Sequence, residues 1–404
     1  MKILLVSTKF PYPPKDGGAI ATLTLVKGYA LAGHTVTVLC MNTPKHFYDP
    51  AMLPADLSST VKFIPVPVDT RIYPFKLVKN FIFSSLPYNA EQFYSLSFEK
   101  KLTEVIKNGD FDIIQLEGIY LVYFAEKIRK LSTAKIILRA PNIEHDIWKT
   151  LAVHEKNFLR KLYLRNFSQR VHSLEDLLMN QYDAIVPITL EDAKIFSLMG
   201  NKKPMHIASF GISTNHFDNV TAANPSSLFF IGALDWMPNL NGLEWFLKEV
   251  WKKKTLKTGQ SKLKFYIAGR NTPGWLKRKY EDERTVFAGE VNDAAKFMED
   301  KGIMVVPLFS GSGMRIKIIE GMAHGKAIIS TSLGASGIDY IHGKQMLIAD
   351  TPDRFTKYIH DLADDPLKQQ QLGKNAADFV RENFDSQSIV HSLLNFYESI
   401  KGKV

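Results

Sequence analysis

Residues 302–326 read GIMVVPLFSGSGMRIKIIEGMAHGK, and they contain in order a β-type run, a glycine-rich turn and a helical pattern. The first part is continuously apolar, as in a strand that is buried on both faces, whereas apolar residues in the last part recur at helical spacing. A strand, a tight turn and a helix in this order form the basic unit of a parallel sheet. This segment therefore predicts an α/β fold with a doubly wound sheet.

The same order of signals recurs on both sides of a segment rich in Ser, Thr, Asn, Gly and Pro, SFGISTNHFDNVTAANPSS at 209–227. We expect two tandem Rossmann-like domains, 1–207 and 220–385, separated by this linker. Residues 386–404 have apolar side chains at helical spacing, and we expect this helix to pack back on the first domain. The expected strands lie in KILLVS, HTVTVLC, FDIIQLEG, AKIILRAPN and YDAIVPIT, then in SLFFIGALDW, KFYIAGRN, TVFAGEV, GIMVVPLFS, KAIISTS and QMLIAD.

The composition is that of an ordinary globular protein, with 45% hydrophobic and 23% charged residues among 404. The single cysteine, Cys40, excludes an internal disulfide and suggests a reduced, buried thiol, so we expect a cytoplasmic protein. No apolar run reaches the length of a membrane-spanning helix. A net charge of +10 favours anionic partners, but the basic residues are dispersed and no nucleic-acid-binding module is present, so nucleic acid is not expected.

The glycine pattern of 310–326 excludes two common phosphate loops. A dinucleotide fingerprint requires a third glycine where Ile316 stands. A P-loop requires four residues between its glycines and a hydroxyl residue after the lysine, but three residues separate Gly321 from Gly325, and Ala327 follows Lys326. What remains is a glycine turn that opens a helix, whose exposed N–H groups and positive dipole end favour an anion.

The first turns of this helix carry Arg315, Lys317 and Glu320. One interpretation is a surface ion pair between Lys317 and Glu320, which lie three residues apart. The other is a binding site, because open α/β sheets bind ligands beyond the carboxyl ends of their strands. A diphosphate that carries a sugar or a nucleoside would fit the glycine turn, the two cations and the carboxylate.

Six blocks, in order along almost the whole chain, resemble retaining glycosyltransferases of the GT-B fold, similar to family 4. The blocks are PYPPKDGG, RAPNIEHDIW, FGISTNHF, IGALDWMPNLNG, IAGRN and SGSGMRIKIIEGMAHGKAIIST. The resemblance implies a nucleotide-diphosphate sugar donor held in a cleft mainly by the second domain, and a glycan or lipid-linked acceptor held mainly by the first. It also implies retention of the anomeric configuration and a role in polysaccharide synthesis. No metal or other cofactor is expected, because the sequence offers no acidic pair placed to hold a metal ion.

The resemblance assigns the catalytic roles to Arg315, Lys317 and Glu320. Glu320 matches the second glutamate of the family's E-x7-E motif, which holds the donor ribose, and Arg315 and Lys317 would then face the diphosphate. Further donor-binding candidates are Gly17, Gly18, Asp235, Trp236, Arg270, Asn292, Gly311, Ser312, Gly313 and Met314. Acceptor-binding candidates are Glu117, Arg139, Asn142, Glu144 and His145.

Several of these candidates also have a purely structural interpretation. Gly17 and Gly18 would suit a flexible turn as well as a close approach to phosphate, and Trp236 could cap a core. Asn142 is placed to N-cap the helix that starts EHDIW. Glu117 could simply form an ion pair with Arg139.

The chain departs from the family pattern in three places. The arginine and lysine that many members carry after the first strand of the second domain are absent from GALDWMPNLNG, and Arg315 and Lys317 would supply that charge. Ser312 stands where the first glutamate of E-x7-E belongs, and Pro141 stands where many members have a histidine. Two alternatives therefore stay open: a nucleotide-sugar 2-epimerase of the same fold, and a non-catalytic sugar-binding relative. Asp110 and Asp112 form the acidic pair that could be considered for a metal, but they precede a strand and so lie at the wrong end of the sheet.

Two segments, RIYPFKLVKNFIF at 71–83 and FLRKLYLRNFSQR at 158–170, interleave basic with large apolar residues. They suggest peripheral contact of the first domain with an anionic membrane, at the inner face of the cytoplasmic membrane. The alternative is that the apolar residues belong to the core and the cations reach past them to solvent.

Overall fold

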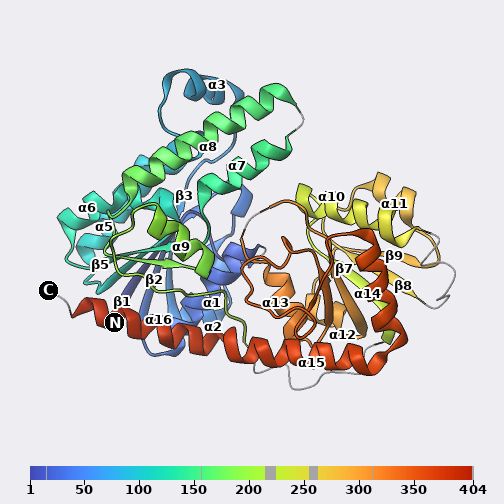
Figure 1. The fold of residues 1–404 in the computed structure, drawn as a ribbon. Coiled ribbons are helices and arrows are strands. Elements are labelled where there is room, and N and C mark those ends of the chain that lie inside the picture. Colours follow the sequence, from blue (N-terminus) through green and yellow to red (C-terminus); the bar gives the residue numbers. More distant parts are fainter. Residues whose placement is uncertain (15, 156, 214–223, 254–262, 312, 403–404) are drawn as a thin grey trace. The chain divides into compact units, whose positions relative to one another are not determined.

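The computed structural model describes residues 1–14, 16–155, 157–213, 224–253, 263–311 and 313–402 (Figure 1). The chain divides into two compact units: Met1–Gly211 with Ser386–Val404, and Ile212–Asp385. Within the described residues each unit contains one parallel six-stranded sheet covered by helices. The predicted α/β class is confirmed. Most of the predicted linker, 214–223, lies outside the described residues.

The sheet of unit 1 has the strand order β3-β2-β1-β4-β5-β6. Its strands are β1 Lys2–Ser7, β2 Thr35–Asn42, β3 Val61–Pro67, β4 Ile113–Glu117, β5 Lys135–Ala140 and β6 Ala184–Pro187. Its helices are α1 Gly17–Leu31, α2 Ala55–Thr60, α3 Pro74–Phe83, α4 Tyr88–Phe93, α5 Leu96–Asn108, α6 Ala125–Leu131, α7 Glu144–His154, α8 Phe158–Leu178, α9 Leu190–Leu198 and α16 Ser386–Lys401, with short 3-10 turns that include η3 Ile119–Phe124.

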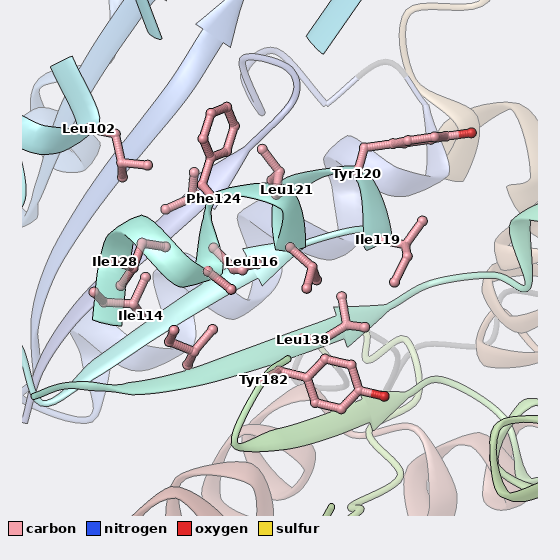
Figure 2. Packing of buried hydrophobic residues seen from close by; sticks show 14 of the residues in the cluster. Leu102, Ile114, Leu116, Ile119, Tyr120, Leu121, Phe124, Ile128, Leu138 and Tyr182 are labelled. Atoms are coloured by element: carbon pink, nitrogen blue, oxygen red, sulfur yellow. The ribbon is translucent and has the colours of Figure 1, made fainter. Parts of the chain in front are cut away.

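Both faces of this sheet are buried, because successive side chains of a strand point to opposite sides. Ile3 and Leu5 of β1 belong to the core shared with α1 and α16. Leu4 and Val6 belong to the opposite core, which η3, α5, α6 and α8 complete. Figure 2 shows part of that second core, in which η3 and α6 lie over β4 and β5.

Strand β3 is the one strand of this sheet that the sequence analysis did not predict. It contains Pro65 and Pro67, which cannot donate a hydrogen bond to a neighbouring strand. They are tolerated because β3 lies at the edge of the sheet and pairs with β2 alone.

Helix α16 packs on α1. Val390 lies so close to Gly28 that a Cβ atom on this glycine would be 2.5 Å from Cγ2 of the valine. The hydroxyls of Tyr397 and Tyr29 both donate to Oε1 of Gln115 on β4, each at 2.8 Å. The last helix of the chain is therefore an integral part of unit 1.

The sheet of unit 2 has the order β12-β11-β10-β7-β8-β9. Its strands are β7 Asn224–Ile231, β8 Lys264–Ala268, β9 Thr285–Gly289, β10 Lys301–Val306, β11 Ala327–Ser330 and β12 Leu347–Ile348. Its helices are α10 Met237–Phe246, which continues into a π-helical turn Leu247–Trp251, then α11 Gly274–Tyr280, α12 Ala294–Glu299, α13 Ile316–Ala323, α14 Pro352–Asp364 and α15 Pro366–Asn383.

Candidate active site

The strand order of unit 2 places β7 and β10 side by side at its centre. From β7 the chain proceeds to β8 and β9 on one side, whereas from β10 it proceeds to β11 and β12 on the other. Ligands of doubly wound sheets bind beyond the carboxyl ends of the two strands at such a switch point. The segments that follow β7 and β10, residues 232–236 and 307–315, contain most of the donor candidates of the second domain.

The turn before α13 requires glycine. Gly311 and Gly313 have φ angles of 105° and 78°, in the left-handed region that side chains disfavour. A Cβ atom on Gly311 would also lie 2.9 Å from Nη2 of Arg315 and 2.9 Å from the Trp236 ring. Glycine therefore lets this ring and this cation approach the turn, while Met314 is half-buried beside them. Ser312 lies outside the described residues.

Arg315 occupies the N-cap position of α13 and is only 8% exposed. Its Cζ lies 5.2 Å from the centroid of the Trp236 ring, a cation–π arrangement. Burial lowers the pKa of its guanidinium to about 10. A guanidinium has no acceptor atom, so it cannot cap the N–H groups of the first turn. The positive charge of Arg315 therefore lies at the positive end of the α13 dipole.

The ion pair between Lys317 and Glu320 that one interpretation predicted is not formed. The Lys317 ammonium instead donates to Oδ1 of Asn239 at 2.9 Å and lies 4.8 Å from the Phe230 ring centroid. Burial, reinforced by the charge of Arg315, lowers the pKa of Lys317 to about 7. Two cations of one helix are thus held together in an environment that disfavours their charge.

Glu320 lies one helical turn further along α13 and is half-buried. Burial raises the pKa of its carboxyl to about 7. A carboxylate in such an environment gains more from hydrogen-bond donors of a ligand than an exposed one would, because less water competes for it.

Asn239 and Gly232 belong to this site, although the sequence analysis did not select them. The amide of Asn239 donates to the carbonyl of Ala233 at 2.9 Å, which directs its oxygen toward Lys317. A Cβ atom on Gly232 would lie 2.8 Å from Nδ2 of Asn239 and 3.0 Å from Nζ of Lys317. Both residues fall in the block IGALDWMPNLNG directly after a predicted strand, and that position was the available signal.

The remaining donor candidates of unit 2 lie nearer the surface. Asp235 accepts a hydrogen bond from Asn271 at 3.0 Å and forms a longer ion pair with Nε of Arg270 at 3.6 Å. Asp235 directly precedes Trp236 in the chain, so this ion pair lies next to the Trp236 position. Asn292 is exposed in the loop between β9 and α12, and no contact in the described part of the chain joins it to Arg315 or Lys317.

In unit 1 the corresponding switch point lies between β1 and β4. Gly17 and Gly18 begin α1 after β1, but the carboxylate of Asp16 accepts from the N–H of Ala19 at 2.9 Å. Asp16 is also paired with Lys9 at 2.5 Å. A negative group of the chain itself therefore occupies the positive end of α1. A Cβ atom on Gly18 would lie 2.8 Å from Nζ of Lys9, so this glycine makes room for the ion pair.

Glu117 and Arg139 adopt the ion-pair alternative. Nη1 of Arg139 lies 3.0 Å from Oε2 of Glu117, and the two side chains are 2% and 7% exposed. Thr22 of α1 donates to the same carboxylate at 2.9 Å. This arrangement holds α1 to the sheet and buries the two charged groups against each other.

Asn142 is not the N-cap of α7, contrary to expectation. Ile143 holds that position, and the buried Glu175 of α8 supplies the cap, accepting from the N–H groups of Glu144 at 2.9 Å and His145 at 3.4 Å. The tertiary contact between α7 and α8 makes a local cap unnecessary. No local sequence pattern indicates this cap, because Glu175 lies 31 residues from Glu144.

Glu175 also orients His145, whose Nδ1 lies 2.5 Å from Oε2 of the glutamate. Burial opposes protonation of this imidazole, but the hydrogen bond and the charge of Glu175 raise its pKa. Burial, and then the charge of Glu175, raise the pKa of the neighbouring Glu144 to about 7, and Tyr120 donates to Glu144 at 3.4 Å. The structure therefore groups Glu144 and His145 with Tyr120 and Glu175 just beyond the carboxyl end of β5.

The acidic pair Asp110 and Asp112 lies at the amino edge of the sheet. Asp112 accepts from the N–H of Lys2 at 2.7 Å and pairs with Lys401 at 2.8 Å. Across the described residues no group of three or more His, Cys, Asp and Glu side chains is arranged to hold a metal ion. A search of the same residues finds no helix with the length and apolarity needed to span a membrane.

Residues 225–365, which hold the whole cluster around α13, match the family model "Glycosyl transferases group 1". The fold and this match define the class of protein: the chain is a glycosyltransferase, and therefore an enzyme. The matched residues lie within the second unit, and the match confirms the resemblance to GT-B glycosyltransferases stated from the sequence.

Several known proteins are similar to this chain over nearly its whole length. A Klebsiella pneumoniae protein described as an uncharacterized 44.6 kDa protein in the cps region is 23% identical, over 97% of this chain and 98% of its own. The fold is similar to that of sucrose-phosphate synthase from Thermosynechococcus elongatus, with a TM-score of 0.71, 15% identity and coverage of 99% of both chains. HepE of Anabaena, solved in complex with UDP-glucose, has a TM-score of 0.66 and 12% identity over 99% of this chain and all of its own.

Proposed function

We propose that this protein is a retaining, family 4-like glycosyltransferase that transfers a sugar from a nucleotide-diphosphate sugar to a glycan or lipid-linked acceptor. One observation carries the proposal: Arg315 and Lys317 meet at the positive end of α13, beyond the switch point of the sheet. Like charges that are partly removed from water repel each other, and an anion between them would relieve the repulsion. A diphosphate is an anion of suitable size and charge.

The same cluster would act in the transition state. Negative charge grows on the β-phosphate as its bond to the sugar breaks, and Arg315, Lys317 and the helix N-terminus would stabilise that charge without a metal ion. Donors that are already in position contribute about 2.7–4 kcal/mol each in sites that exclude water. Glu320 would accept hydrogen bonds from the ribose hydroxyls of the donor.

The acceptor side of the proposal rests on unit 1. Glu144 and His145 are held by Glu175 beyond β5, at the edge of the sheet where ligands bind, and both are polar groups suited to acceptor hydroxyls. The buried pair Glu117–Arg139 would support this region without touching the acceptor.

The biological setting is inferred from the relatives and from the surface. The similar Klebsiella protein is described as lying in the cps region, and this supports a role in polysaccharide synthesis. Apolar and basic residues exposed on α3 and α8 support peripheral contact with an anionic membrane, where a lipid-linked acceptor would be found.

A thermal-shift screen with UDP-, GDP- and ADP-sugars tests the donor site, because a ligand of the native state raises the melting temperature. UDP-glucose is the first candidate, given its complex with HepE. We expect stabilisation of the wild type and loss of it in Arg315→Ala/Lys317→Ala, with Arg354→Ala/Lys357→Ala on the exposed face of α14 as the charge-matched control. Equal stabilisation of both double variants would refute the assigned site.

Product analysis then separates the reaction classes. Transfer to an acceptor with retained configuration supports the proposal. Conversion of the donor sugar in the absence of acceptor would indicate a 2-epimerase, and binding without any turnover would indicate a sugar-binding relative.

A further inference from the structure

Helix α3 presents an apolar stripe outward. Phe75, Val78 and Ile82 are 80%, 56% and 62% exposed, and their spacing of three and four residues places them on one face. The start of α8 is similar, with Phe158 and Leu159 at 76% and 73%. Soluble proteins seldom expose large apolar side chains so close together unless another surface covers them.

The exposure of this stripe is not a sign of a loosely attached helix, because the opposite face of α3 is fixed to α8. Arg170 donates to the carbonyls of Asn80 and Phe81 at 3.1 and 2.7 Å. The rings of Phe81 and Tyr163 lie 5.6 Å apart. Figure 1 shows α3 beside α8, in agreement with these contacts. The outward direction of Phe75, Val78 and Ile82 is therefore set by packing.

The two helical segments carry charge of one sign. Residues 71–83 contain three Lys and Arg, residues 158–170 contain four, and neither segment contains an Asp or Glu. Exposed apolar side chains flanked by Lys and Arg are the combination that binds the interface of an anionic bilayer.

A third face of α3 borders a pocket of about 560 Å³, within the range of small-molecule sites. Lys76 and Lys79 line it together with aromatic and polar side chains that include Tyr73 and Tyr88. The carboxylate of Glu91 also lines the pocket, where it accepts a hydrogen bond from the Ser84 hydroxyl. Arg71, also in the lining, is neutralised by Asp69 at 2.8 Å. Neither Lys76 nor Lys79 forms an ion pair with any residue that the structure describes, so their charge is available to a ligand.

We propose that this pocket binds the phosphate of an anionic phospholipid headgroup while Phe75, Val78 and Ile82 insert among the acyl chains beside it. The inference rests on the membrane contact included in the proposed function, and it names the lipid chemistry and the residues. Lys76 and Lys79 lie on the face of α3 next to the apolar stripe. One helix would therefore bind both the headgroup and the acyl chains of the lipid.

Flotation of the whole chain with vesicles tests this inference without reference to transfer. We expect the wild type to float at low salt with phosphatidylcholine vesicles that contain phosphatidylglycerol, and not with phosphatidylcholine alone. Lys76→Ala/Lys79→Ala should lower the partition coefficient about 25-fold, because each cation near an anionic surface contributes about a factor of five. Phe75→Ser/Ile82→Ser should lower it by a similar factor.

Two matched controls keep the test specific. Lys100→Ala/Lys107→Ala removes the same charge from exposed positions of α5, and Leu31→Ser/Leu198→Ser removes exposed leucines away from α3; both should float like the wild type. Absence of wild-type binding, or an equal loss in the α5 variant, would overturn the inference. If Arg160→Ala/Arg165→Ala, near the start of α8, lowered the partition coefficient as much as Lys76→Ala/Lys79→Ala, binding would depend on the total charge and not on the pocket. Stabilisation by nucleotide sugars is measured separately on the same variants, so failure of the donor site would be distinguished from failure of the membrane site.

Discussion

Lys317 and Glu320 both have a pKa of about 7 in the free protein, reached from opposite directions. A bound diphosphate favours the charged lysine, so donor binding takes up a proton and should weaken as the pH rises above about 7. Binding to ionised Glu320 releases a proton and should weaken as the pH falls below about 7. We therefore expect donor affinity, measured by calorimetry, to peak near neutral pH. Lys317→Met should remove the alkaline fall and Glu320→Gln the acid one; unchanged profiles would contradict the assignment.

Glu320 and Arg315 should separate by kinetics. Glu320→Ala leaves donor hydroxyls unpaired and should weaken donor binding by about 1–3 kcal/mol, seen as a higher KM. Arg315→Ala should chiefly lower kcat, because its charge matters most when the β-phosphate leaves. Lys317→Ala should resemble it with a smaller effect. Lys344→Ala, at an exposed lysine of the same unit, is the control. Wild-type kinetics in all three site variants would show that these side chains of α13 take no part in donor binding or transfer.

At the scale of elements, the contact between α1 and α16 depends on Gly28. Alanine is the better helix former by about 1 kcal/mol, yet its Cβ would lie 2.5 Å from Val390. Because overpacking costs about 1–3 kcal/mol, we expect Gly28→Ala to lower the free energy of unfolding by about 1 kcal/mol. Urea unfolding measures it. Val390→Ala in the same chain should remove the clash, so the double variant should be more stable than additivity predicts. A stabilised Gly28→Ala would show that the helices separate easily.

At the scale of the whole molecule, the charge of the departing diphosphate would be stabilised by the protein's own groups, Arg315, Lys317 and the N-terminus of α13. We therefore expect transfer to survive treatment with EDTA, with an unchanged rate within about a factor of two. A donor–acceptor assay before and after chelation is the measurement. Loss of activity that Mn²⁺ or Mg²⁺ restores would contradict this scheme.

Much of the architecture follows from local sequence. Residues 302–326 and their counterparts predict the strands, the helices and the class, because burial on both faces of a parallel sheet produces continuous apolar runs. Strand β3 was not predicted, because Pro65 and Pro67 are compatible with a strand only at the edge of a sheet. Whether a strand lies at the edge is decided by the tertiary structure. The cluster of Arg315, Lys317 and Glu320 was predicted because all three lie within two turns of one helix.

The sequence by itself determined the sheets, the glycine turn before α13 and the resemblance to glycosyltransferases, since each depends on residues close together in the chain. Tertiary structure alone decided which charges are buried and which apolar groups are exposed. It buried Glu117 against Arg139, capped α7 with a distant Glu175, directed Asn239 to Lys317, and turned the apolar stripe of α3 outward. The physical reason is that burial, and with it the pKa and the availability of a group, is set by neighbours that the chain brings together only on folding.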